Sequence, residues 1–158
     1  MKKFFAIIAL ALVAFVACSP KESGVKGPLS VVNGQWHLVE WNGETPEFDV
    51  YIKFENGNFD IYQQVYSLFY ENYNGTYSII DSTLSGVYTS GSKWACNYNF
   101  IIEKREFTND DKTYEANALV LKSNEKSSIE SVYEECQIPQ SVIDEASETR
   151  ACEFTPFL

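Results

Sequence analysis

Apolar and polar residues alternate through most of the chain after its first 33 residues, and this two-residue period constrains the fold more than any other feature. Residues 48–54 place Phe, Val, Ile and Phe at every second position, and Asn56-Gly57 follows directly. Asn-Gly favours a two-residue β-hairpin turn because both residues accept positive φ. A second alternating run begins at Phe59. The sequence therefore predicts a β-hairpin centred on residues 56 and 57.

Turn-forming residues interrupt the alternation at short intervals, so the pattern predicts eight short strands. Short connections make neighbouring strands antiparallel, and a meander of this length removes its exposed edges by closing into a barrel. We therefore predict an all-β, eight-stranded antiparallel up-and-down barrel, with a two-sheet β-sandwich as the alternative. The expected strands are 36–41, 48–54, 59–65, 73–79, 84–89, 94–103, 114–121 and 129–135.

A short helix is expected after the last strand. Pro139 is followed by Val142, Ile143 and Ala146, which have helical spacing. This spacing predicts one helix that packs on the outside of the barrel or across one of its ends.

The first 17 residues differ in character from the rest. Lys2 and Lys3 are their only charges, and an apolar run of 14 residues follows. This run is shorter than the roughly 20 residues that a membrane-spanning helix needs, so it predicts a signal peptide; a short membrane helix is the alternative. Residues 18–33 are rich in Pro, Gly and Ser and are interpreted as a flexible tether. Residues 34–158 then form one domain.

Two resemblances to known sequence motifs suggest a cellular location and a protein family. Phe15-Val16-Ala17-Cys18 resembles a bacterial lipobox, which implies lipidation of Cys18. Gly34-Gln35-Trp36 resembles the Gly-x-Trp motif of lipocalins, and the order of signal, lipobox, tether, strand meander and helix resembles the lipocalin-like lipoproteins of Bacteroidetes. Further matching segments are Asn74-Gly75-Thr76-Tyr77, Leu84-Ser85-Gly86-Val87-Tyr88, Gly91 and Trp94. The resemblance implies a barrel closed near Gly34 and Trp36, anchored in the bacterial outer membrane and facing the periplasm or the cell surface.

Charge and residue types narrow the function classes. The chain carries 22 acidic and 12 basic residues, a formal net charge of −10. This charge argues against nucleic-acid binding and against docking on anionic lipid through a basic face. His37, the single histidine, follows Trp36 and is interpreted as a rim residue rather than part of a catalytic triad. Asn109-Asp110-Asp111 is interpreted as a polar turn, because it lacks the spaced ligands of a calcium loop. We predict a protein that is not an enzyme and holds no metal or cofactor.

Aromatic residues are abundant, with 3 Trp, 10 Tyr and 11 Phe. An eight-stranded barrel has room to be filled by side chains or to hold one small ligand, so an inward aromatic set predicts either a packed core or an aromatic-lined pocket. The inward set is Phe48, Phe54, Phe59, Tyr77, Tyr88, Trp94, Tyr98 and Phe100. From this set we predict Trp94, Tyr98, Tyr77 and Tyr88 as ligand-binding residues.

Three tyrosines, Tyr51, Tyr62 and Tyr66, fall on the opposite strand face. We expect these tyrosines either to form an exposed aromatic patch or to pack against the C-terminal helix. The leading functional hypothesis is a lipid-anchored, lipocalin-like protein that binds a small apolar ligand. The alternative is a filled barrel that docks a protein or glycan partner through its surface aromatics.

Three cysteines remain beyond Cys18. Cys136 and Cys152 bracket the expected helix, and an exported protein can form disulfides, so these two are a candidate pair. Such a bridge would contribute roughly 3 kcal/mol in the chain-entropy model. Cys96 alternates in phase with Trp94 and is expected to be buried. Three free thiols are the alternative.

Overall fold

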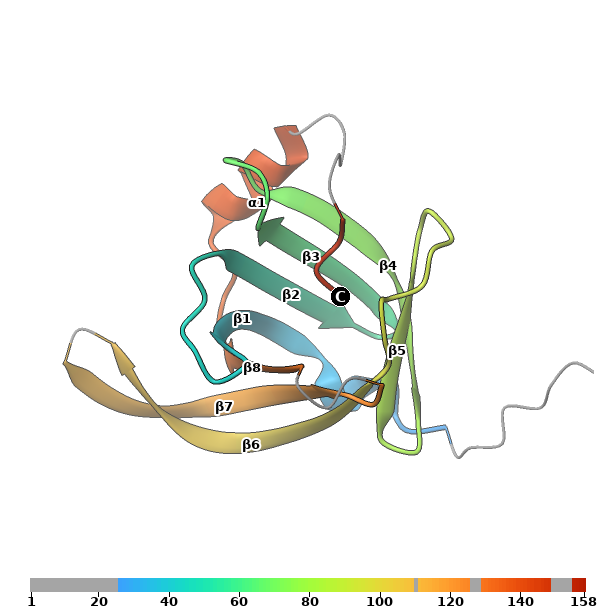
Figure 1. Cartoon of the computed structure of the whole chain (residues 1–158), viewed down its shortest axis with the longest axis horizontal. Coiled ribbons are helices and arrows are strands. Elements are labelled where there is room, and N and C mark those ends of the chain that lie inside the picture. Colours follow the sequence, from blue (N-terminus) through green and yellow to red (C-terminus); the bar gives the residue numbers. More distant parts are fainter. Residues whose placement is uncertain (1–25, 110, 126–128, 149–154) are drawn as a thin grey trace, which may run out of the picture.

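The computed structural model of the chain describes residues 26–109, 111–125, 129–148 and 155–158. Eight antiparallel strands pair in chain order, and β1 pairs with β8 to close the ring (Figure 1). The predicted up-and-down barrel is confirmed, and a two-sheet sandwich is ruled out. The elements are η1 (Leu29–Val32), β1 (Gly34–Trp41), β2 (Asp49–Glu55), β3 (Asn58–Gln64), β4 (Glu71–Ile80), β5 (Thr83–Tyr88), β6 (Tyr98–Asn109), β7 (Lys112–Ser123), β8 (Glu130–Glu135) and α1 (Gln140–Glu148).

The β2–β3 hairpin forms where the Asn-Gly pair predicts it. Asn56 and Gly57 have φ values of 49° and 92°, which suit a tight turn between right-twisted strands. Phe54 therefore pairs with Phe59, and both side chains are buried. The local turn signal thus sets the register that directs one face of both strands into the barrel.

Aromatic side chains fill the middle of the barrel. The Trp94 ring centroid lies 5.1 Å from that of Phe59 and 6.4 Å from that of Phe54. Tyr133 and Tyr98 are almost fully buried in the same cluster. The sequence left open whether the inward aromatic residues form a packed core or line a pocket. In the middle of the barrel they form a packed core. Phe48 and Phe100, also predicted to point inward, are only partly buried.

Strand β6 begins later and ends later than the sequence predicts. Trp94 lies before the strand, in a connection that folds back so that its backbone N–H donates to the Gly86 carbonyl at 3.0 Å. A Cβ atom on Gly86 would overlap the Trp94 indole, so glycine is needed for this close approach. At its other end β6 continues to Asn109 and pairs with β7 along its whole length, while it pairs with β5 only near Leu84.

The folded domain begins before the predicted boundary at Gly34. The Gly27 backbone N–H donates to the Ile79 carbonyl at 3.0 Å, and Val32 in η1 is fully buried. The Trp36 indole lies against Gly34 and donates from Nε1 to the Val32 carbonyl at 3.1 Å. The end of the segment interpreted as a tether is therefore part of the barrel. Cys18 and the predicted signal peptide lie outside the described residues.

Helix α1 packs on the outside of the barrel, as one of the predicted alternatives states (Figure 1). Val142 and Ala146 are buried, and the partly buried Tyr51 and Tyr62 pack against their cluster. Two of the three outer tyrosines thus cover the helix, whereas Tyr66 is 64% exposed. Within the described ranges, no helix is long and apolar enough to cross a membrane.

Replacing Gly86 tests how tightly Trp94 is packed. We expect Gly86→Ala to lower the free energy of unfolding by about 2 kcal/mol, because the added methyl group must displace the indole. Alanine would otherwise stabilise a strand position relative to glycine, so the sign of the effect is informative. Urea unfolding measures the change. Ser85→Ala, on the same strand but facing outward, should stay within about 0.5 kcal/mol of the native protein. Equal stability of both variants would contradict the packing.

Candidate functional site

The four aromatic residues predicted to bind a ligand all lie inside the barrel, but at different places. Trp94 and Tyr98 belong to the packed middle, with ring centroids 6.1 Å apart. Tyr77 donates its hydroxyl to the Leu29 carbonyl at 2.8 Å and so holds η1. Tyr88 donates to the Leu158 carbonyl at 2.6 Å. Tyr88 therefore bonds to a segment that comes from residues 155–158 and enters the barrel.

That segment, Thr155–Leu158, enters the barrel at the end of β1 that carries Trp41 (Figure 1). Leu158 is 2% exposed and belongs to the core cluster. The Phe157 ring packs against Trp41, with centroids 4.7 Å apart, and against Phe48 at 5.6 Å. These four residues thus contact the barrel but take part in no strand pairing among the described elements. We call the surface formed by Trp41, Phe48, Gln63 and Tyr88 the Trp41 end.

Gln63 is a buried polar group of the Trp41 end that sequence reasoning missed, and its register partner on β4, Glu71, is buried as well. Gln63 Nε2 donates to the Thr155 carbonyl at 3.1 Å, and Gln63 Oε1 accepts from the Phe157 backbone N–H at 2.7 Å. The Gln63 side chain is fully buried. A signal was present, because Gln63 stands in the inward phase after Phe59 and Ile61, where an amide must find partners. Burial also raises the pKa of Tyr88, so its hydroxyl remains a donor.

Trp94 Nε1 is buried without a hydrogen-bond partner among the described residues, whereas the buried hydroxyl groups of Ser131 and Tyr133 interact with each other. Ser131 pairs with Trp41 in the strand register, which places it beside the Trp41 end. Buried hydroxyl groups are usually paired, since an unpaired one costs about 1–3 kcal/mol.

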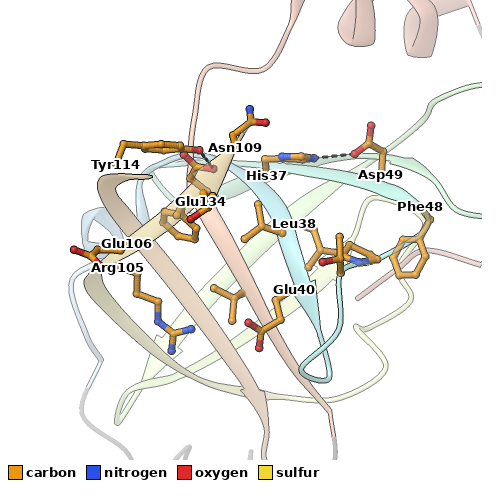
Figure 2. A pocket seen from close by; sticks show the side chains of 16 residues that line it. His37, Leu38, Glu40, Phe48, Asp49, Arg105, Glu106, Asn109, Tyr114 and Glu134 are labelled. Atoms are coloured by element: carbon orange, nitrogen blue, oxygen red, sulfur yellow. Dashed lines mark hydrogen bonds and ion pairs between the residues drawn. The ribbon is translucent and has the colours of Figure 1, made fainter. Parts of the chain in front are cut away.

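A groove lies outside the barrel, between the β1–β2 connection and the end of the β6–β7 hairpin, and we call it the outer groove. Its volume is about 470 Å³, and Val39, Phe107 and Val132 supply apolar lining. Figure 2 shows His37 and Asp49 along one edge, with Arg105 and Glu40 toward the opposite edge. This outer groove is an open surface of mixed charge rather than an apolar pocket.

His37 belongs to a hydrogen-bonded network at the rim of the outer groove (Figure 2). Its Nε2 lies 2.8 Å from Asp49 Oδ1, its ring stacks on Tyr51 at 4.4 Å, and Tyr70 donates to Asp49 Oδ2 at 2.6 Å. The hydrogen bond to His37 lowers the pKa of Asp49, helped by Tyr70 and opposed by burial. Burial first and then the Asp49 charge raise the pKa of Tyr51 to about 12. The network joins β1 and β2 to Tyr70, which belongs to the buried cluster under α1.

Neither of the two described cysteines, Cys96 and Cys136, has the character of a nucleophile. Burial and the neighbouring Glu134 and Glu135 raise the pKa of Cys136 to about 11, which disfavours the reactive thiolate. Cys96 is buried in the core, as expected. Cys136 has no disulfide partner among the described residues. Cys152 lies outside them, so the Cys136–Cys152 bridge stays a prediction.

The acidic turn joins β6 to β7, with Asn109 pairing with Lys112 and Asp111 at φ 60°; Asp110 lies outside the described residues. Among the described side chains, no group of three or more His, Cys, Asp or Glu residues could hold a metal ion.

Comparison with known proteins identifies no relative. No family model matches the sequence, and comparisons with curated proteins and with solved structures found no match. The barrel and its contacts are therefore the basis for a functional proposal.

The Asp49 network predicts a pH dependence of stability. Because the folded state lowers the pKa of Asp49, its contribution is complete above the unfolded value of about 4 and is lost as pH falls through the lowered value. Asp49→Asn should therefore be less stable than the native protein at pH 6, and the difference should shrink between pH 4 and pH 2. Urea unfolding across this range measures it. Asp60→Asn, on the neighbouring strand, is the control; a pH-independent difference for Asp49→Asn would contradict the network.

Proposed function

We propose that this protein is a lipid-anchored, lipocalin-like binding protein of the bacterial cell envelope that holds a small, largely apolar ligand at the Trp41 end. One observation carries the proposal: this end already holds a guest, since Phe157 and Leu158 fill it without being part of the barrel's strands. A site that accepts an aromatic ring and a branched aliphatic group has the chemistry of an apolar ligand site. The lipobox resemblance at Cys18 supports the anchor.

A ligand at this site must take the place of Phe157 and Leu158. Burying one such side chain contributes roughly 1.5–3 kcal/mol, so exchange is feasible for a ligand of comparable apolar area. The packed middle around Trp94 remains intact in this exchange, because its ring contacts are with Phe54, Phe59 and Tyr98. Of the predicted ligand-binding residues, the proposal therefore keeps Tyr88 as a direct contact.

A filled barrel that docks a protein or glycan partner is the second candidate. The β3–β4 connection favours it, because Tyr66, Leu68 and Phe69 are 64%, 85% and 60% exposed. Tyr51 and Tyr62, expected as part of such a patch, pack instead against the cluster of α1. The docking surface would then consist of the connection alone. We propose no catalytic role in either case.

Emptying the Trp41 end tests the binding proposal. In the double variant Phe157→Ala, Leu158→Ala, we expect N-phenyl-1-naphthylamine to bind at least about tenfold more tightly than to the native chain, because its aromatic groups can replace the lost side chains. Probe fluorescence measures the affinity. Leu68→Ala, Phe69→Ala removes the same two residue types from the exposed connection and should match the native chain. Absence of probe binding by every variant would refute an apolar site and favour the docking function.

The anchor is tested separately. If Cys18 is lipidated, the full-length chain expressed in a lipoprotein-processing bacterium should incorporate radiolabelled palmitate and sediment with membranes. Cys18→Ser should lose the label and move to the soluble fraction. Ser19→Ala is the matched control and should keep both properties. Palmitate incorporation by Cys18→Ser would show that the anchor assignment is wrong.

A further inference from the structure

The guest at the Trp41 end is held by its main chain as well as by its side chains. Among the described residues, three hydrogen bonds join the barrel to main-chain atoms of the segment: Gln63 Nε2 donates to the Thr155 carbonyl, the Phe157 N–H donates to Gln63 Oε1, and the Tyr88 hydroxyl donates to the Leu158 main-chain oxygen. Every peptide carries such groups, whatever its side chains. These contacts therefore recognise an extended peptide rather than a particular residue.

Gln63 is suited to this role. A carboxamide that donates to one carbonyl and accepts from an N–H two residues later imitates the hydrogen bonding of a neighbouring strand. Pro156, the residue between these two groups, has no N–H that would need a partner. The fully buried position of Gln63 on β3 makes an unoccupied amide costly, so the site favours an occupant with a peptide backbone.

Side-chain contacts add selectivity at two positions. The Phe157 ring packs against both Trp41 and Phe48, which also contact each other, and Leu158 is buried in the core. Thr155 is exposed and Pro156 half-buried. The surroundings thus select an aromatic residue followed by a branched aliphatic residue, and leave the preceding positions free.

We infer that the Trp41 end is a peptide-binding site for extended segments in which an aromatic residue precedes a branched aliphatic one, with Thr155–Leu158 as its resident occupant. This inference rests on the proposed binding function and names the ligand class. Joined to the barrel by its own chain, the resident segment acts at an effective concentration of the order of 1 mM. A free peptide therefore competes poorly until the resident segment is weakened.

The test uses the full chain and the peptide acetyl-Thr-Pro-Phe-Leu-amide, labelled with fluorescein on the exposed threonine side. Fluorescence anisotropy should show binding to the Phe157→Ala, Leu158→Ala variant at least about tenfold tighter than to the native chain, because the competing segment is weakened. The peptide acetyl-Thr-Pro-Ala-Ala-amide should bind at least about tenfold more weakly than the first peptide. Equal affinity of the two peptides would overturn the side-chain selectivity.

Gln63→Met in the same background separates backbone recognition from apolar binding. It should abolish peptide binding and leave naphthylamine binding intact, whereas Gln64→Met, on the outward face of β3, should retain both. Probe binding without peptide binding by the double variant would overturn this inference and leave the proposed function standing. If the double variant binds neither the peptide nor the probe, both this inference and the proposed function are overturned.

A second measurement covers the case in which the double variant does not fold. In the native chain, millimolar peptide should displace the resident segment and speed hydrogen exchange of the Phe157 amide. At 10 mM, the peptide is in about tenfold excess over the effective concentration of the resident segment and should displace it. If the exchange rate of the Phe157 amide is unchanged at this concentration, the inference is overturned.

Discussion

Pairing of β1 with β8 closes the sheet, and the inward side chains of eight strands must then share one small interior. The rings of Phe54, Phe59 and Trp94 take up the middle of this space, and Gly86 contributes no side chain where the indole enters. Room for another group remains at the ends. One end receives η1 through Val32, and the Trp41 end receives Leu158.

Local signals account for the parts of the fold that the sequence predicts well. The turn at Asn56 and Gly57 and the burial phase of the hairpin follow from the alternation and from positive φ. The predicted start of β6 is wrong because alternating burial shows which side chains point inward, but not whether the backbone pairs with a neighbouring strand. Trp94, Cys96 and Tyr98 are all buried, yet only Tyr98 lies in the strand. The far end of β6 was missed because its charged residues carry no apolar period.

The candidate site was harder to predict, for a physical reason. The inward phase identified Tyr77, Tyr88, Trp94 and Tyr98 as interior residues, but phase carries no information about position along the barrel axis. A four-residue segment is also too short to show a period, and its contact with Gln63 spans more than 90 positions of the chain. Polar residues in an apolar phase, Gln63 and its register partner Glu71, were the local signal for this place.

The packed middle and the guest at the Trp41 end are physically linked. The Tyr88 ring packs on Phe59 with centroids 5.4 Å apart, and Phe59 packs on Trp94, so the tight core positions the hydroxyl that holds Leu158. Receptor groups held rigidly lose little entropy when they bind, and this lowers the cost of recognition. Residues Thr155–Leu158, in contrast, take part in no described strand pairing, so their release would break the hydrogen bonds to Gln63 and Tyr88 and leave the ladder intact. A filled barrel is therefore compatible with the proposed binding function, because the packed middle holds the groups of the Trp41 end in place.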